Sequence, residues 1–201
     1  MQTRSEQKLG SIFIDIDGTL ANMMERFDEV LRSEGLRPPR EGYTTYNLAG
    51  LLGISKAELS RLFCKTWSEP EKIRPMVPGI GKIIDGFKEN FEVVIITSNN
   101  YASESSLKQW LASHGIKYDR FLRVNEQLDK AKYAPYILID DYGEVIRAHV
   151  ERNKGSYAIL IPWPYNEGQE RTNERIYRIG WDQAEKKVNE LALLLKDALR
   201  K

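Results

Sequence analysis

The chain has a single cysteine among its 201 residues, Cys64, and it has no long hydrophobic run. One cysteine cannot form an internal disulfide, which fits a reducing compartment, so we expect a cytoplasmic protein. Because Cys64 directly follows Leu62 and Phe63, we expect a small buried hydrophobic side chain rather than a nucleophile. No apolar segment approaches the roughly 20 residues that span a bilayer, which excludes a membrane-spanning helix.

The chain also lacks an excess of charge, since 30 basic and 29 acidic residues leave a formal net charge of +1. Such a balance gives no strong field for binding nucleic acid or an anionic membrane. The first ten residues are polar and lack the apolar centre of a signal peptide, so we expect a flexible tail over 1–9. The length suits one core with a small insertion, and a homodimer is compatible with it.

The most informative segment present is 12–20, where an apolar run ends in two carboxylates one residue apart. The run 12–14 is typical of a strand buried on both faces of a parallel sheet. Asp15 and Asp17 then fall at its carboxyl end, where open α/β sheets bind ligands. Two acids so close repel each other unless a cation or a shared proton relieves them.

This string, Ile-Phe-Ile-Asp-Ile-Asp-Gly-Thr-Leu, resembles the first motif of the haloacid dehalogenase-like superfamily, which consists chiefly of phosphate-ester hydrolases. The resemblance implies that Asp15 is the nucleophile and Asp17 the general acid/base. It also implies a Thr or Ser, a Lys and an acidic residue or pair at later strand ends. The sequence contains all three: Thr97-Ser98-Asn99-Asn100 after strand 91–96, Asp140-Asp141 after strand 136–139, and Lys130 ten residues before Asp140, with Lys132 as the alternative.

Helical and strand patterns alternate after Pro78-Gly79, which favours an α/β fold: a Rossmann-like parallel sheet sandwiched by helices. We expect helices over 79–90, 103–114, 142–153 and 182–199, and strands over 91–97, 121–124, 136–140 and 157–161. The segment 21–78 shows no convincing strand, and it contains a helical pattern over 21–33 and a second helix that begins with a capping box at 55–58. We therefore expect a core of 10–20 plus 79–201 and a small helical cap, 21–78, inserted after the first strand.

The resemblance further implies a magnesium site and a set of phosphate-binding residues. The metal ligands are the Asp15 carboxylate, the Asp17 backbone carbonyl and Asp141, with Asp140 in support. Oxygen ligands and a substrate phosphate favour Mg²⁺ over softer metals. Thr97, Ser98 and Asn99 are expected to bind the phosphoryl group, and Lys130 to balance its charge and hold Asp15.

Within the superfamily, the chain is most similar to the 5'(3')-deoxyribonucleotidases. The similarity rests on the segments 15–21, 96–98, 129–130 and 138–141 and on Gly180-Trp181-Asp182 before the last helix. It implies that the substrate is a nucleoside monophosphate, whose base stacks on an aromatic side chain of the cap. Phe27 and Trp67 are the preferred candidates, with Tyr43, Tyr46 and Phe63 as others. The chain departs from that family at Thr19 and Asn22, where Val and Asp are usual, and at Met23-Met24, where an aromatic residue is expected.

Other functions are compatible with the same residues. A phosphatase for another small metabolite, such as a sugar phosphate or phosphoglycolate, would use the same chemistry. A nucleic-acid 3'-end phosphatase would need a basic groove, which the near-neutral charge does not favour. A catalytically inactive regulatory module on this fold would be expected to lack one of the motif acids, and all of them are present.

Overall fold

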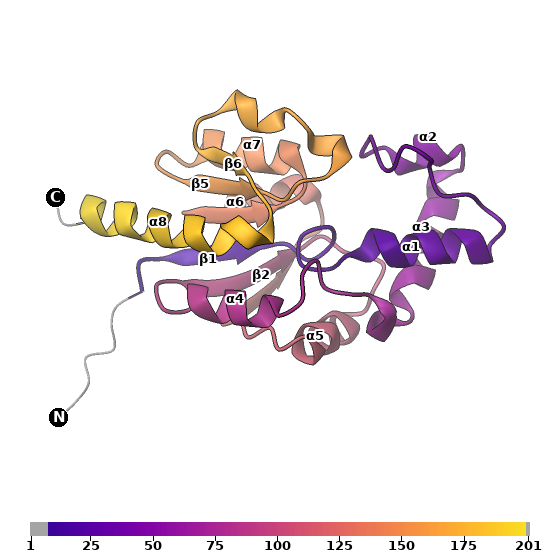
Figure 1. Ribbon diagram of the computed structural model, residues 1–201, viewed down its shortest axis with the longest axis horizontal. Helices are drawn as coiled ribbons and strands as arrows, with labels where there is room; N and C mark the ends of the chain where they lie inside the picture. The colour runs from indigo at the N-terminus through magenta and orange to yellow at the C-terminus, as the bar shows by residue number, and fades with distance from the viewer. Residues whose placement is uncertain (1–7, 200–201) are drawn as a thin grey trace.

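A six-stranded parallel sheet forms the centre of the computed structural model, which describes residues 8–199 (Figure 1). Most of the tail expected over 1–9 therefore lies outside the described residues. The strand order is β3-β2-β1-β4-β5-β6. The strands are β1 (Ser11–Ile14), β2 (Glu92–Thr97), β3 (Arg120–Arg123), β4 (Ile137–Asp140), β5 (Tyr157–Leu160) and β6 (Ile176–Arg178).

The order of the strands reverses at β1, which pairs with β2 on one side and with β4 on the other. Ile12, for example, lies opposite Val93 in β2 and Ile137 in β4. In a doubly wound sheet of this order, the crevice outside the carboxyl ends of the strands at the reversal point is the usual binding site. The fold thus brings the two carboxylates that follow β1 to that crevice.

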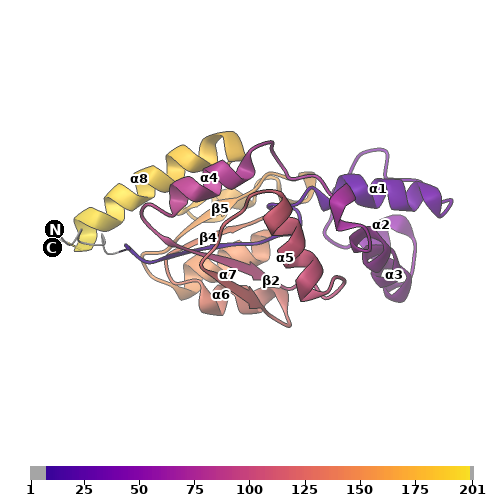
Figure 2. The ribbon, with the colours of Figure 1, turned by 90° about the horizontal axis from the view of Figure 1, so that it is seen from below.

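Apolar side chains on both faces of the sheet are buried under helices, as the unbroken apolar strands predict. Alternate residues of β1 face opposite layers: Ile12 and Ile14 lie in one core cluster, and Phe13 lies in the other. Helices α4 (Ile80–Phe87) and α8 (Trp181–Leu199) cover one face, and α7 (Gly143–Arg152) covers the other, with α6 (Lys130–Tyr133) beside it (Figure 2). Helix α5 (Glu104–Ser113) adds its apolar residues to the same cluster as α4.

Three helices between β1 and α4 form the cap, at the end of the molecule opposite the start of β1 and the last turn of α8 (Figure 1). They are α1 (Met23–Ser33), α2 (Leu48–Leu52) and α3 (Lys56–Trp67). The Ser55 hydroxyl caps α3 by accepting a hydrogen bond from the Glu58 backbone N–H, at 3.1 Å, as the capping-box sequence predicts. Two hydrogen bonds join the chain entering the cap to the chain leaving it: Asn22 N–H to Arg74 O and Met76 N–H to Leu20 O, both 2.8 Å.

The predicted fold class is confirmed, including the helical insertion after the first strand. The expectation for Cys64 is wrong, because its side chain is exposed. Leu62, Phe63, Thr66 and Trp67 form the buried face of α3, and Cys64 lies outside that stripe. The helical period, rather than the two apolar neighbours, decides which way this side chain points.

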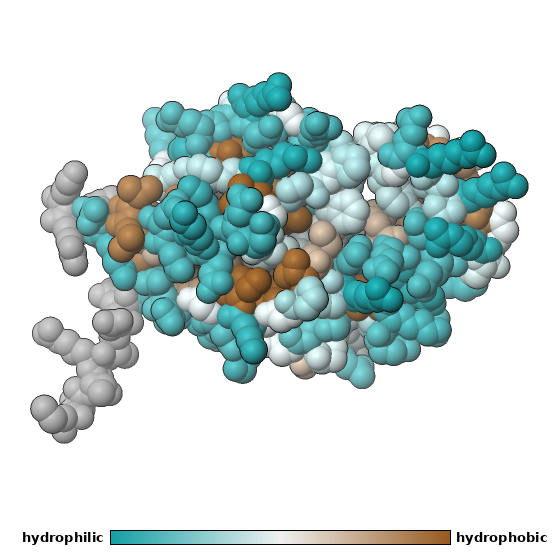
Figure 3. All heavy atoms as spheres, in the orientation of Figure 1, coloured by the Kyte–Doolittle hydropathy of each residue, from teal (hydrophilic) through white to brown (hydrophobic). Residues whose placement is uncertain are grey.

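Hydrophilic residues cover most of the face seen in Figure 3, and hydrophobic ones gather in smaller patches, one of them along α8. Helix α8 exposes two leucines, Leu193 and Leu194. None of the helices in the described part of the chain is long and apolar enough to cross a membrane.

Candidate active site

Three strand-end segments and Lys130, the first residue of α6, lie together at the carboxyl edge of the sheet, and sequence reasoning singled out all four. The Asp15 backbone N–H donates to Ile139 O at 3.0 Å, so the chain beyond β1 still pairs with the end of β4. This pairing brings Asp15 beside Asp140 and Asp141, and carboxylate oxygens of the three acids lie within 4.8 Å of one another. All three are at least 94% buried, with exposures of 3%, 0% and 6%.

Lys130 forms ion pairs with two of these three acids, Asp15 and Asp140. Its ammonium Nζ lies 2.7 Å from Asp15 Oδ1 and 3.0 Å from Asp140 Oδ2, and the residue is 1% exposed. Burial alone would lower the pKa of Lys130, but the charges of Asp140 and Asp15 raise it above its usual range, so the ammonium stays protonated. Burial raises the pKa of Asp15 well above its ordinary value, and Lys130 opposes that shift. Lys132, the alternative candidate, is exposed and pairs with Asp129 instead.

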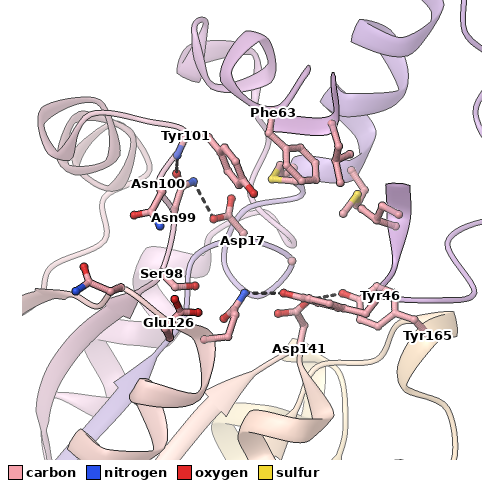
Figure 4. Close-up of a pocket in the computed structure, with 17 residues that line it drawn as sticks. Asp17, Tyr46, Phe63, Ser98, Asn99, Asn100, Tyr101, Glu126, Asp141 and Tyr165 are labelled. Carbon is pink, nitrogen blue, oxygen red and sulfur yellow. Dashed lines mark hydrogen bonds between the residues drawn. The ribbon is translucent and has the colours of Figure 1, made fainter. Parts of the chain in front are cut away.

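The Asp17 carboxylate accepts a hydrogen bond at each oxygen. Trp67 Nε1 of α3 donates to Oδ1 at 2.9 Å. Asn99 Nδ2 donates to Oδ2 at 2.8 Å (Figure 4). The Asn99 amide is itself oriented, because its Oδ1 accepts from the backbone N–H groups of Tyr101 and Ala102. Burial raises the pKa of Asp17 to about 6, and the two donors act in the opposite direction. A carboxyl with this pKa exchanges a proton readily near neutral pH.

Asp141 lies on the other side of the loop that carries Asp17. Burial and the neighbouring Asp140 charge raise its pKa to about 7. The Tyr165 hydroxyl donates to Asp141 Oδ2, and the Thr19 hydroxyl donates more weakly to Oδ1, at 3.4 Å. Gly18, with a φ of +72°, permits this approach, because a Cβ there would meet Asp141 Oδ2 at 2.5 Å.

The backbone of the loop 16–19 leaves one carbonyl free to bind a cation. Ile16 O accepts the N–H groups of residues 19, 20 and 21, while Trp163 Nε1 donates to Gly18 O and Trp181 Nε1 donates to Thr19 O, both at 2.7 Å. Within residues 8–199, no hydrogen bond reaches the carbonyl of Asp17. This free carbonyl and the carboxylates of Asp15 and Asp141 form an all-oxygen donor set that suits a hard divalent cation.

Asp140 is placed to support this set rather than to extend it. One of its oxygens is paired with Lys130, and the other accepts the Tyr142 backbone N–H at 2.8 Å. Asp140 therefore keeps Lys130 in contact with Asp15. The supporting role of Asp140 stays a prediction.

The residues after β2 divide between the interior and the adjoining cavity. Thr97 is fully buried, and its hydroxyl oxygen accepts the Asn99 N–H at 3.0 Å, which leaves its own proton for another acceptor. Ser98 and Asn99 line the cavity. The geometry thus brings Thr97, Ser98 and Asn99 to one strand end beside Asp17, as sequence reasoning expected.

A cavity of about 330 Å³ opens between the cap and this edge of the sheet (Figure 4). The cap contributes apolar and aromatic side chains, and the core contributes mainly carboxylates, amides and tyrosines. Among residues 8–199, no lysine, arginine or histidine lines it. The lining residues are Asp17, Gly18, Met23, Met24, Tyr46, Leu48, Leu59, Phe63, Ser98, Asn99, Asn100, Tyr101, Asn125, Glu126, Gln127, Asp141 and Tyr165.

The two aromatic residues preferred for base stacking lie elsewhere. Phe27 is fully buried within the cap, where it packs against Phe63 at a ring-centroid distance of 4.8 Å. Trp67 is 2% exposed and is not a lining residue. Both face inward because they belong to the apolar stripes of their helices. Phe63 and Tyr46, the less favoured candidates, do reach the cavity, while Tyr43 is buried against Phe27.

Sequence reasoning missed several residues of this site, among them Tyr165, Tyr142 and Gln127. The Tyr165 hydroxyl donates to Asp141 (Figure 4). Tyr142 stacks on Tyr46 of the cap with ring centroids 3.9 Å apart, and Gln127 donates to the Tyr46 hydroxyl at 2.6 Å. Tyr165 lies in a loop after Trp163-Pro164, with no periodic pattern to indicate its role. The signal that could have indicated it is the presence of two aromatic residues, Trp163 and Tyr165, on either side of Pro164.

Comparisons with known proteins identify the fold. The chain matches no protein family profile and no curated protein sequence. It is similar to a number of solved structures at low identity, among them the following three. A haloacid dehalogenase-like family hydrolase from Xanthomonas campestris has a TM-score of 0.57 at 15% identity, over 95% of this chain and 99% of that one.

The second solved structure is a predicted phosphoglycolate phosphatase from Haemophilus somnus 129pt, with a TM-score of 0.58 at 16% identity, over 88% of this chain and 96% of the other. The third is CbbY from Rhodobacter sphaeroides in complex with xylulose-(1,5)bisphosphate. It has a TM-score of 0.54 at 19% identity, over 85% of this chain and 93% of the other. At these identities the likeness shows the fold alone, which is haloacid dehalogenase-like. It gives no support to the narrower resemblance to deoxyribonucleotidases.

Proposed function

We propose that this protein is a magnesium-dependent phosphomonoester hydrolase acting on a small phosphate ester. The observation that carries the proposal is the buried arrangement of Asp15, Lys130, Asp140 and Asp141 beside Asp17 at the switch point of the sheet. A structural ion pair would need neither the third buried carboxylate nor a cavity beside it. Strongly perturbed acids next to a cavity are typical of a catalytic centre.

The residues divide the reaction between attack and proton transfer. The Asp15 carboxylate attacks phosphorus, and the ester P–O bond breaks as an aspartyl-phosphate forms. The leaving oxygen takes the proton of Asp17, which then accepts a proton from the water that hydrolyses the intermediate. Lys130 holds Asp15 in place and offsets the charge of the phosphoryl group. Thr97 and Ser98 are suited to donate hydrogen bonds to its oxygens.

Asp15, the Asp17 carbonyl and Asp141 would hold the Mg²⁺ ion. When bound, the ion neutralises carboxylate and phosphoryl charge. The pKa values of Asp15 and Asp141 are raised first by burial and then by the neighbouring carboxylates, which fits this assignment. The buried cluster holds three carboxyl groups and only the one ammonium of Lys130. The residues that the chain supplies therefore call for a further cation.

The segment 21–78 acts as a cap that selects the leaving group, because six of the cavity's lining residues come from it. Phe63, Tyr101 and Tyr46 offer aromatic surface, and Met23 and Met24 offer adaptable apolar surface. These side chains suit the uncharged ring system of a nucleoside, so a nucleoside monophosphate is the candidate that the cavity favours.

The alternative substrates are phosphoglycolate and sugar phosphates, which the names and bound ligand of the similar structures suggest. Phosphoglycolate and a sugar bisphosphate each carry a second anionic group. That group would meet Glu126 and no lining cation within the described residues. A sugar monophosphate has no such conflict and remains the stronger alternative.

A panel of phosphate esters tests the proposal. It should contain 5'- and 3'-nucleoside monophosphates with ribose and deoxyribose, sugar monophosphates, a sugar bisphosphate and phosphoglycolate. We expect release of phosphate with Mg²⁺, and the highest kcat/KM for an ester with an uncharged leaving group. A preference for sugar monophosphates would reject the nucleotide assignment but retain the chemistry.

Asp15→Asn tests the chemistry itself. Asp85→Asn is the matched control, because Asp85 also pairs with a lysine, Lys117, but is partly exposed. Asp15→Asn should fold and lose turnover with every ester, while Asp85→Asn should keep it. Near-normal hydrolysis by Asp15→Asn would reject the nucleophile assignment. An oligonucleotide with a 3'-phosphate as the best substrate would instead favour the end-phosphatase alternative. No turnover by the wild type with any ester would favour an inactive module.

A further inference from the structure

All four tryptophans of the chain donate their indole N–H to one of two segments. Three of them donate to the loop 17–19 after β1, and one donates to Ile73, where the chain returns from the cap. Trp163 and Trp181, both from the core, donate to the carbonyls of Gly18 and Thr19. Trp110 of α5 donates to Ile73 O, at 2.8 Å, where the chain returns from the cap. Only Trp67 comes from the cap itself, and only Trp67 donates to a carboxylate of the site.

Trp67 is fixed at the junction of cap and core. It is the last residue of α3, and its ring meets that of Trp110 edge to face, with centroids 6.3 Å apart and planes at 78°. The residues are 2% and 1% exposed, so neither ring can turn without repacking its surroundings. The position of the Trp67 N–H is therefore set by how the cap sits on the core.

We propose that Trp67 is a positioning residue that couples the cap to proton transfer by holding the Asp17 carboxylate in the orientation that serves the leaving group. This inference rests on the proposed phosphatase function, in which Asp17 supplies the proton. With Asn99 on one oxygen and Trp67 on the other, the carboxylate has no free rotation about its Cβ–Cγ bond. Loss of the cap-borne donor would leave Asn99 as its only side-chain anchor.

A structural role and a positioning role differ in how the leaving group affects the rate. Hydrolysis of 4-nitrophenyl phosphate releases a stabilised phenolate, which needs little help from an acid. Hydrolysis of benzyl phosphate, an ester of similar size, releases an alkoxide that must be protonated. The ratio kcat/KM covers the steps up to the first irreversible one, here loss of the leaving group, so it isolates the step that uses the Asp17 proton.

The test compares three variants with both esters in the presence of Mg²⁺. In Trp67→Phe, which keeps an aromatic ring but lacks the donor, kcat/KM for benzyl phosphate should fall roughly tenfold or more. For 4-nitrophenyl phosphate the change should stay within about threefold. Trp110→Phe controls for packing at the same junction, and Trp181→Phe for rigidity of the loop. Both controls should change the two esters by the same factor.

The nitrogen-15 spectrum of the tryptophan side chains tests the contact in the native fold. The Trp67 indole resonance should shift in Asp17→Asn more than the other three, a result that does not depend on whether Trp67→Phe folds. Two results would overturn the inference and leave the phosphatase proposal intact. One is an equal fall in kcat/KM for both esters in Trp67→Phe. The other is a Trp67 indole resonance that does not shift in Asp17→Asn. A wild type inactive with every ester would overturn both.

Discussion

Lys130→Met should destabilise the protein strongly, because it removes the ammonium that pairs with two buried carboxylates, those of Asp15 and Asp140. Methionine is close to lysine in length and fills the space without a charge. Asp15 and Asp140 would then face each other with Asp141 nearby and no cation. Removing one partner of a buried ion pair typically costs about 3–5 kcal/mol, since a charge is left uncompensated. We expect a loss in that range in the free energy of unfolding at pH 8 without Mg²⁺.

The loss should depend on pH in a defined direction. Burial already raises the folded-state pKa of Asp15 well above that of an aspartate in the unfolded chain, about 3.9, and loss of Lys130 removes the charge that opposes this shift. The penalty for ionising Asp15 in the folded state is complete only above its raised pKa, and it shrinks as the pH falls towards 4. Urea unfolding curves at pH 8 and pH 5, in chelator, should therefore show a smaller difference from the wild type at pH 5.

Two control variants make the test specific. Lys117 lies 3.0 Å from Asp85, the same distance as Lys130 from Asp140, but its side chain is 71% exposed. Lys117→Met should cost less than about 1 kcal/mol. Adding Asp140→Asn to Lys130→Met removes one of the uncompensated carboxylates, so it should restore part of the lost free energy of unfolding. If Lys130→Met costs no more than Lys117→Met at pH 8, the buried-charge reasoning is wrong.

Three further predictions concern the metal and the titrating groups. Mg²⁺ should raise the Tm of the wild type and have little effect on that of Asp141→Asn, and excess chelator should stop turnover; full activity in chelator would reject the metal assignment. The folded-state pKa values of Asp17, about 6, and Asp141, about 7, exceed that of an unfolded aspartate, so the metal-free fold binds more protons. These two groups should make its free energy of unfolding fall between pH 5 and pH 8, and Mg²⁺ should remove most of the fall, as urea titrations would show. Burial lowers the pKa of His149 to about 4, so this residue should destabilise the fold by about 2 kcal/mol at pH 5 relative to pH 8, and His149→Gln should lack that contribution.

The sequence was sufficient for those elements whose residues carry a local pattern. The apolar runs at 12–14, 92–97 and 137–140 became β1, β2 and β4, and each is followed by the polar residues that chemistry requires. The parallel sheet follows because helices separate these runs. By contrast, β6 has only three residues, Ile176–Arg178, and α2 only five, so neither offers a full period to recognise.

The lining of the cavity could not be predicted in the same way, because it depends on which cap residues meet the core. Phe27 and Trp67 are aromatic residues of the cap, as Phe63 is, yet the structure buries them and places Phe63 at the cavity. Periodicity shows that all three belong to the buried faces of their helices. It does not show which residues of a buried face line a cavity instead of packing in the core. That boundary is set by contacts between residues far apart in the chain, such as Tyr46 with Tyr142.

The four indole N–H groups suggest how a rigid catalytic loop and a selective cap can work together. Donors from the core fix the carbonyls of Gly18 and Thr19, so the backbone that carries Asp17 keeps its shape whatever the cap does. The side chain of Asp17 is different, since one of its two donors belongs to the cap. A displacement of the cap would therefore move Asp17, the proposed proton donor, and leave Asp15, the proposed nucleophile, in place, because Asp15 is held by Lys130 of the core. On this argument, a leaving group that fits the cavity badly should impair proton transfer before it impairs attack.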